Sequence, residues 1–219
     1  MDFIEFNRVG WNVLTVSTAG VLLLTCLQAS ALILQYRRIW KHQSSMSVSK
    51  IWFLYSFFAH SAMLVYGIKQ RSFAIFVAGL LTPFYLSILL GLWKFTKTGK
   101  REWVAGILGV VVLGAVSLLP LTATLYYFIA PIGCAAMAAQ PIAIMRSGRR
   151  GALEIRLVIV NSVANVFWVI YGFALNDELL KIIMPVGIIF FLATVVLWWR
   201  ASPETIPKKT DNFLKWKFV

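Results

Sequence analysis

Seven apolar segments, each long enough to cross a bilayer, follow one another along the chain with only short loops between them. A hydrocarbon core about 30 Å thick needs roughly 20 apolar residues per helix. Such segments occupy residues 11–36, 51–68, 73–93, 103–120, 123–145, 154–175 and 179–199. In lipid, backbone polar groups must be satisfied within the segment, and a helix does this. We therefore expect an all-α membrane protein with seven transmembrane helices.

Basic residues are concentrated in alternate loops. Of the 21 lysine and arginine residues, 17 lie in or beside alternate loops or in the C-terminal tail, all on one side of the predicted membrane. The other side has only Arg8, Lys69, Arg71 and Lys181. The positive-inside rule therefore predicts that the N-terminus lies outside and the C-terminus in the cytoplasm. These loops face anionic headgroups, which accounts for the net charge of +13 without nucleic acid as a partner. We expect a multi-pass protein of a plasma or inner membrane rather than of an organelle.

The first three segments align with the last three when shifted by 105 residues, the interval from Gln35 to Gln140. At this shift Tyr66-Gly67 falls on Tyr171-Gly172. After three helices and one linker helix, the chain is again on the side of the membrane where it began. Both triplets therefore cross the membrane in the same direction, as in transporters with parallel repeats. We predict a 3+1+3 arrangement. Its parts are a first repeat over 1–101, a linker helix over 102–121, a second repeat over 122–200 and a cytoplasmic tail over 201–219.

Polar residues inside two matched segments form one stripe each. In the sixth segment the stripe contains Asn161, Asn165, Trp168 and Gly172. In the second segment it contains Ser56, His60, Met63 and Gly67. Residues at these spacings share one face of a helix. Polar groups in a membrane usually face a cavity, or they hydrogen-bond between helices and hold them together. We favour a role in lining a path for Asn165 and Trp168, and both roles stay open for Ser56 and Asn161.

His60 is the only ionisable residue well inside a predicted span. It could couple transport to protons, because histidine titrates near neutral pH. It could equally be a neutral hydrogen-bonding group at the position of Asn165 in the other repeat, which we favour. Acidic residues near the later spans, Glu154, Asp177 and Glu178, sit only at the ends. Passive facilitation is therefore a simpler expectation than coupling through a buried acid.

Matched residues also mark both ends of the predicted bundle. Pro141 and Pro185 are expected to interrupt or kink their helices, because proline removes a backbone hydrogen bond. Such kinks can serve as hinges. The predicted gates and hinges are Gln35, Gln140 and Pro141 at the cytoplasmic end, and Tyr66, Tyr171 and Pro185 towards the outside.

Other residues indicate how the spans sit in lipid. Tryptophans near span ends suit an aromatic belt at the membrane interfaces: Trp11, Trp52, Trp93, Trp103, Trp198 and Trp199. Cys26 and Cys134 lie within apolar segments, which favours packing over a disulfide. The acidic start of the chain predicts no cleaved signal peptide.

The segment Asn165-Val-Phe-Trp168-Val-Ile-Tyr171-Gly172, followed by Asp177 and Pro185-Val186-Gly187, resembles the SWEET sugar facilitators of the PQ-loop superfamily. Gln140-Pro141 to Arg146-Ser147 looks like the PQ-loop end of a helix. The resemblance covers nearly the whole chain and implies three helices, a linker and three helices.

The resemblance also implies how a sugar would bind, with one tryptophan and one asparagine from each repeat. Trp168 matches one tryptophan, Met63 occupies the place of the other, and Val186 occupies the place of an asparagine. The region of Leu81 and Thr82 has no asparagine either, so three of the four contacts are missing. A site with fewer hydrogen-bond partners discriminates hydroxyl groups poorly. A more apolar solute or an amino acid therefore stays open beside a sugar.

We expect a SWEET-like facilitator that moves a small uncharged or zwitterionic solute, a sugar or a related compound, by alternating access. The residues expected to bind the solute are Ser56, His60, Met63, Asn161, Asn165, Trp168 and Val186. The alternative is a non-transporting PQ-loop receptor for a ligand or cargo signal.

Two further classes fit less well. A retinal protein needs a lysine in the middle of the last span, whereas Lys181 is at its start. An enzyme needs a nucleophile, a base and an orienting group, and neither these nor metal-ligand spacing is found. We expect no cofactor and no metal. The expected partners are the solute and the bilayer, with a homo-oligomer left open.

Overall fold

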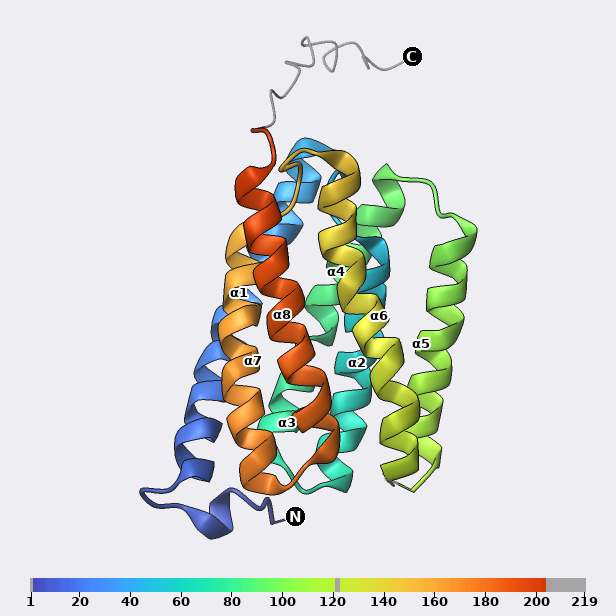
Figure 1. The fold of residues 1–219 in the computed structure, drawn as a ribbon. Coiled ribbons are helices and arrows are strands. Elements are labelled where there is room, and N and C mark those ends of the chain that lie inside the picture. The colour runs from blue at the N-terminus through green and yellow to red at the C-terminus, as the bar shows by residue number, and fades with distance from the viewer. Residues whose placement is uncertain (1, 121–122, 204–219) are drawn as a thin grey trace, which may run out of the picture.

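Seven helical spans, each long and apolar enough to cross a membrane, make up the computed structural model, which describes residues 2–120 and 123–203 (Figure 1). The helices are α1 (Val13–His42), α2 (Lys50–Lys69), α3 (Phe73–Gly79), α4 (Thr82–Phe95), α5 (Lys100–Leu118), α6 (Ala123–Ser147), α7 (Ile155–Leu175) and α8 (Glu178–Arg200). A short 3-10 helix, η1 (Phe6–Arg8), precedes α1. Within the described ranges there is no strand, so the predicted all-α fold with seven spans is confirmed.

The third span consists of two helices, which the sequence analysis did not predict. α3 ends at Gly79 and α4 begins at Thr82, with Pro83 in its first turn. Proline has no N–H group and is tolerated at the start of a helix rather than in its interior. The Thr82 hydroxyl donates a hydrogen bond to the Gly79 carbonyl at 2.7 Å. This bond satisfies the carbonyl oxygen that the Pro83 nitrogen leaves free.

Pro141 and Pro185 do not interrupt their helices, so the prediction of a break at each was wrong, and a kink at either stays a prediction. α6 runs through Pro131 and Pro141, and α8 runs through Pro185. A proline removes only one hydrogen bond of a long span, and neighbouring helices stabilise the rest. Whether these positions act as hinges stays a prediction.

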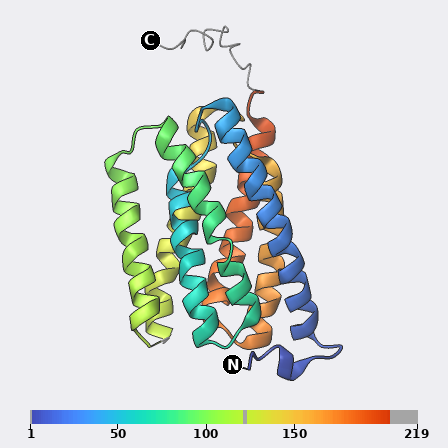
Figure 2. The same cartoon turned by 180° about the vertical axis from the view of Figure 1, so that it is seen from behind.

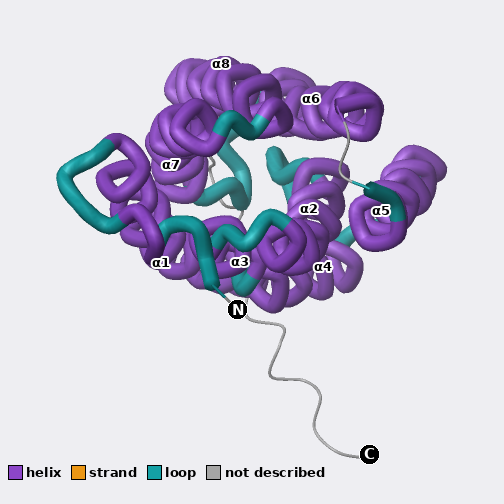
Figure 3. Tube along the Cα trace, turned by 90° about the horizontal axis from the view of Figure 1, so that it is seen from below, coloured by secondary structure: helices purple, strands orange, loops and turns teal. Residues whose placement is uncertain are grey.

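In each triplet the third span lies between the other two. α4 contacts both α1 and α2, and α8 contacts both α6 and α7. Between the triplets, α1 packs on α7 and α2 packs on α6, which closes a ring of six spans (Figure 3). α5 stands outside this ring against α2, as Figure 1 and Figure 2 also show. The two triplets thus have the same order in space, as the 3+1+3 fold class predicts.

Two matched glycines allow close packing within the triplets. A Cβ atom on Gly67 of α2 would lie 2.5 Å from the backbone nitrogen of Phe76 in α3. A Cβ atom on Gly172 of α7 would lie 2.8 Å from Leu180 Cβ in α8. Small residues bring helices close together in lipid, where packing replaces the hydrophobic effect. This explains the glycine in each Tyr-Gly pair.

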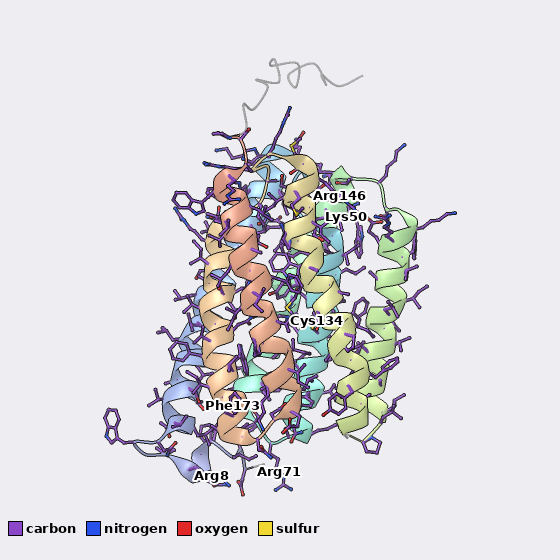
Figure 4. The ribbon with its side chains drawn as sticks, viewed as in Figure 1. Arg8, Lys50, Arg71, Cys134, Arg146 and Phe173 are labelled. Atoms are coloured by element: carbon purple, nitrogen blue, oxygen red, sulfur yellow. The ribbon has the colours of Figure 1, made fainter. Side chains whose placement is uncertain are left out.

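The loops separate into two ends of the bundle. The basic end holds the loops 43–49, 96–99 and 148–154 and carries Lys50 and Arg146, whereas the N-terminal end carries Arg8 and Arg71 (Figure 4). The Lys69 ammonium at the N-terminal end donates to three carbonyl groups at the end of α5. The charge asymmetry therefore separates the two ends, and the orientation in a membrane stays a prediction. Of the predicted tail, residues 204–219 lie outside the described residues.

Candidate functional site

A cavity of about 100 Å³ lies where the two triplets meet. Since a water molecule occupies about 30 Å³ of liquid volume, the cavity has room for about three waters or a small part of a solute. Side chains from every helix except α5 line it. Six residues predicted from the sequence are among them: Ser56, His60, Met63, Asn161, Asn165 and Trp168.

The lining residues are paired by the repeat. Four pairs separated by the same 105 positions contribute to the wall: Ser56 with Asn161, His60 with Asn165, Met63 with Trp168, and Ala78 with Ile183. Each pair places one side chain from each triplet in the wall. The cavity therefore lies on the axis that relates the two repeats.

Val186 is not among the residues that line the cavity. Ile183 and Met184 contribute from α8 instead. The neighbouring Gly187 leaves room for the amide group of Asn165 in the cavity wall, because a Cβ atom at this position would clash with that amide.

Asn161 both joins the two triplets and faces the cavity. Its Oδ1 accepts a hydrogen bond from Gln28 Nε2 of α1 at 2.5 Å. Its Nδ2 group is buried without a partner among the described residues. An unpaired buried donor costs about 1–3 kcal/mol, so an acceptor on a bound solute would stabilise this amide. Both roles that the sequence left open for Asn161 are therefore compatible with its position.

The ring of His60 is held in one orientation. Its Nδ1 lies 2.7 Å from the Ser56 carbonyl oxygen, and the ring packs in a tilted arrangement against Tyr85, with centroids 4.4 Å apart. A carbonyl oxygen only accepts, so Nδ1 carries a proton and Nε2 of the neutral ring is an acceptor. This geometry suits the neutral hydrogen-bonding role.

Trp168 lies in the cavity wall and is only 4% exposed. Its indole packs edge-to-face on Tyr171, with centroids 5.5 Å apart. Its flat face can stack on a solute ring, since aromatic faces suit apolar and C–H surfaces.

The assignment of Trp52 to an interfacial belt was wrong. Trp52 is 2% exposed, lines the cavity and packs against Phe191 of α8. It lies one turn before Ser56 and therefore on the same inward face of α2. The spacing from Trp52 to Ser56 can be read from the sequence, but the position of Trp52 near the end of a span favoured the belt assignment. The cavity residues that the sequence analysis did not assign to the site are Gln28, Trp52, Tyr55, Ala59, Ala78, Tyr85, Met137, Ile183, Met184 and Phe191.

Towards the basic end, two matched glutamines bond the triplets to each other. Gln35 of α1 donates from Nε2 to the Ala152 carbonyl at 2.9 Å and accepts from the Glu154 N–H at 2.7 Å. Gln140 of α6 donates to the Ser47 carbonyl at 2.9 Å and accepts from the Ser49 N–H at 2.9 Å. Each amide thus bonds twice to the loop of the opposite triplet. Both glutamines are fully buried.

The two loops also bond to each other. The Ala152 N–H donates to the Met46 carbonyl at 2.9 Å, and the hydroxyl oxygens of Ser47 and Ser147 lie 2.8 Å apart. Arg38 forms an ion pair with Glu154 at 3.4 Å on the same layer. These bonds make the basic end a continuous hydrogen-bonded layer between the triplets.

At the N-terminal end, the two matched tyrosines bond to residues of the opposite triplet. The Tyr66 hydroxyl donates to Asp177 Oδ2 at 2.6 Å. The Tyr171 hydroxyl lies 2.6 Å from Ser72 Oγ and donates to Glu5 Oε1. Burial raises the pKa of Glu5, but hydrogen bonds from Tyr171 and nearby amides outweigh it and hold this pKa below its ordinary value. Both tyrosines therefore bridge the triplets.

A larger groove of about 990 Å³ lies between α2, α5 and α6. Its wall consists mostly of small and aliphatic side chains and includes Arg101. Lys50 and Arg146 line it at the basic end (Figure 4). It lies beside α5, the linker helix, which stands outside the ring of six spans. We therefore take the central cavity as the candidate site.

Comparison with known protein families agrees with this geometry. Residues 114–205 match a family model described as "Sugar efflux transporter for intercellular exchange". No curated protein and no solved structure matches the chain. The matched stretch contains the end of α5 and all of α6, α7 and α8, including Gln140, Asn165, Trp168 and Tyr171. The resemblance is therefore confirmed, with residues 114–205 carrying the sequence pattern of the SWEET family of sugar efflux transporters.

Proposed function

We propose that the chain is a facilitator that passes a small uncharged or zwitterionic solute, a sugar first among the candidates, by alternating access. The observation that carries this proposal is the cavity between the triplets, with matched side chains in its wall and hydrogen-bonded layers that join the triplets towards each end of the bundle. The match of the second triplet to sugar efflux transporters supports it.

The wall of the cavity suits a solute with both hydroxyl groups and apolar faces. Asn161 Nδ2 is a donor, His60 Nε2 is an acceptor, and the Asn165 amide offers both functions. Trp168 and Met63 supply apolar contact surface. No carboxylate, lysine or arginine is among the lining residues, so an ion would lose its hydration shell without a counter-charge. A sugar fits these conditions better than a charged metabolite.

The placement of the two hydrogen-bonded layers supports alternating access. The glutamine layer and the tyrosine layer both consist of bonds between the triplets. Rocking one triplet against the other separates one layer while the other stays closed. In this proposal, the occluded conformation is the one in which both layers are formed. Pro141 directly follows Gln140, where flexing of α6 would release the layer at the basic end.

The test is uptake into proteoliposomes with a panel of sugars, amino acids and vitamins. We expect saturable uptake of at least one sugar, lowered tenfold or more by Trp168→Ala. Trp199→Ala is the matched control, because that indole is exposed on α8 away from the cavity. Equal uptake by wild type and Trp168→Ala would remove Trp168 from the site. If no solute moves and none raises the melting temperature, the receptor alternative replaces the proposal.

A further inference from the structure

The two closing tyrosines meet chemically different partners at matched positions. Asp177 follows α7, and the residue 105 positions earlier is Ser72, which follows α2. Tyr66 therefore reaches the carboxylate of the opposite triplet, whereas Tyr171 reaches a hydroxyl at the corresponding position. By its own sequence, the first repeat lacks the acid that the second repeat has.

Glu5 supplies a carboxylate at the first repeat. Its Oε1 accepts hydrogen bonds from the Tyr171 hydroxyl, from Ser72 Oγ at 3.0 Å and from the Ala74 N–H at 3.2 Å. Its Oε2 accepts from the Phe73 N–H at 3.0 Å. Asp177 makes a similar pair of contacts, because it accepts from Tyr66 and from the Leu180 N–H at 3.1 Å. In the first repeat the N–H matched to Leu180, that of Ile75, donates to Ser72 Oγ, so the acid and the cap are supplied by two residues. Both carboxylates thus bind the third span of one triplet and the tyrosine of the other.

The segment that carries Glu5 is fixed to the first triplet. The Ile4 N–H donates to the Arg71 carbonyl at 2.8 Å. Phe3 packs on Phe73 with ring centroids 5.5 Å apart, and Phe6 packs on the same ring at 5.2 Å. Glu5 itself is 5% exposed. The segment before α1 therefore crosses the N-terminal end of the bundle (Figure 3), with its carboxylate directed inwards.

We infer that Glu5 is a positioning residue of the gate at the N-terminal end, where it replaces the acid missing from position 72. The inference rests on the proposed function, because this end of the bundle is a gate only if a solute passes through it. The segment moves with the first triplet, and the Tyr171–Glu5 bond breaks when this end opens. Charged acceptors make stronger hydrogen bonds than neutral ones, so the carboxylate closes this half of the gate more firmly than Ser72 alone.

The test measures access to the cavity and needs no solute. A single cysteine is placed at Ala59, which lines the cavity, in a protein carrying Cys26→Ala and Cys134→Ala. The labelling rate with a polar maleimide is then measured on purified protein in detergent. We expect Glu5→Gln to raise the rate at least fivefold, and Tyr171→Phe to do the same. Glu178→Gln is the matched control, because this acid at the same end bonds to Lys181. It should leave the rate unchanged.

A rescue variant separates loss of the carboxylate from loss of the fold. Ser72→Asp in the Glu5→Gln protein places an acid where the second repeat has Asp177, and we expect it to restore the slow rate. An unchanged rate in Glu5→Gln would overturn the inference. So would a raised rate that Ser72→Asp does not reverse. Since no transport is measured, failure of the proposed function would leave this result interpretable.

Discussion

Gln35 and Gln140 make the same two hydrogen bonds in opposite directions across the molecule. Each amide donates to one backbone carbonyl and accepts from one backbone N–H on the loop of the other triplet. The exchange is reciprocal because the glutamines occupy equivalent positions of the two repeats. A rigid-body movement between the triplets would therefore break all four bonds together.

Loss of either glutamine should weaken the basic end to a similar extent. Gln140→Ala leaves the Ser49 N–H and the Ser47 carbonyl without their side-chain partner, and an orphaned buried group costs roughly 1–3 kcal/mol. We expect a lower melting temperature and faster labelling of the cavity cysteine, with a comparable change in Gln35→Ala. The control is Ile142→Ala on the exposed face of α6. A large effect in only one of the two glutamine variants would contradict the reciprocal arrangement.

Two glycines provide a matched test of helix packing. Gly67→Ala places a Cβ atom 2.5 Å from the backbone of Phe76, where no side-chain rotation can relieve the clash. Overpacking of this kind costs about 1–3 kcal/mol or more. Gly114 in α5 has nothing within 4 Å of its ideal Cβ position, so Gly114→Ala should be neutral or stabilise the helix by roughly 0.5–1 kcal/mol. Thermal unfolding monitored by circular dichroism compares the two variants. Equal melting temperatures would show that α2 and α3 are not closely packed at this point.

The lowered pKa of Glu5 predicts a dependence of stability on pH. A carboxylate whose pKa falls below its ordinary value of 4.5 on folding stabilises the folded state above that pH. The contribution is lost as the pH falls through the lowered pKa. We therefore expect wild type to be more stable than Glu5→Gln at pH 7, and the difference to shrink as the pH falls below about 4.5.

Other charged groups at this end are common to both proteins. Asp177, Arg71 and Arg8 are present in wild type and in Glu5→Gln, so the difference between their melting curves reports Glu5 alone. A difference that stays constant from pH 7 to pH 3 would show that the carboxylate charge does not contribute.

The spans and much of the cavity could be predicted because both depend on periodic patterns. The length of each apolar segment predicts a helical span. Polar residues at helical spacing then indicate the face of α7 that carries Asn165 and Trp168. The shift of 105 residues predicts the matching face of α2, and His60 and Met63 on that face line the same cavity. Gln35 and Gln140 were found by the same shift, although their hydrogen bonds depend on loops whose shape the sequence pattern does not give.

The remaining features depend on contacts between distant segments. Glu5 lies outside every span, and nothing in its local sequence indicates that it meets Tyr171. Trp52 was wrongly assigned to the membrane interface because it lies near the end of a span. Its face on α2, one turn before Ser56, points into the cavity instead. The break before Pro83 was accessible from sequence, since proline disfavours a helix interior.

The most direct test of alternating access is a reversible cross-link across the basic end. The hydroxyl oxygens of Ser47, in the loop before α2, and Ser147, the last residue of α6, lie 2.8 Å apart on opposite triplets. The variant Ser47→Cys/Ser147→Cys, made without Cys26 and Cys134, should form a disulfide on oxidation, verified by mass spectrometry. We expect uptake to stop in the oxidised protein and to return on reduction, with either single-cysteine variant unaffected by oxidation. Undiminished uptake through the cross-linked protein would contradict alternating access between the two triplets.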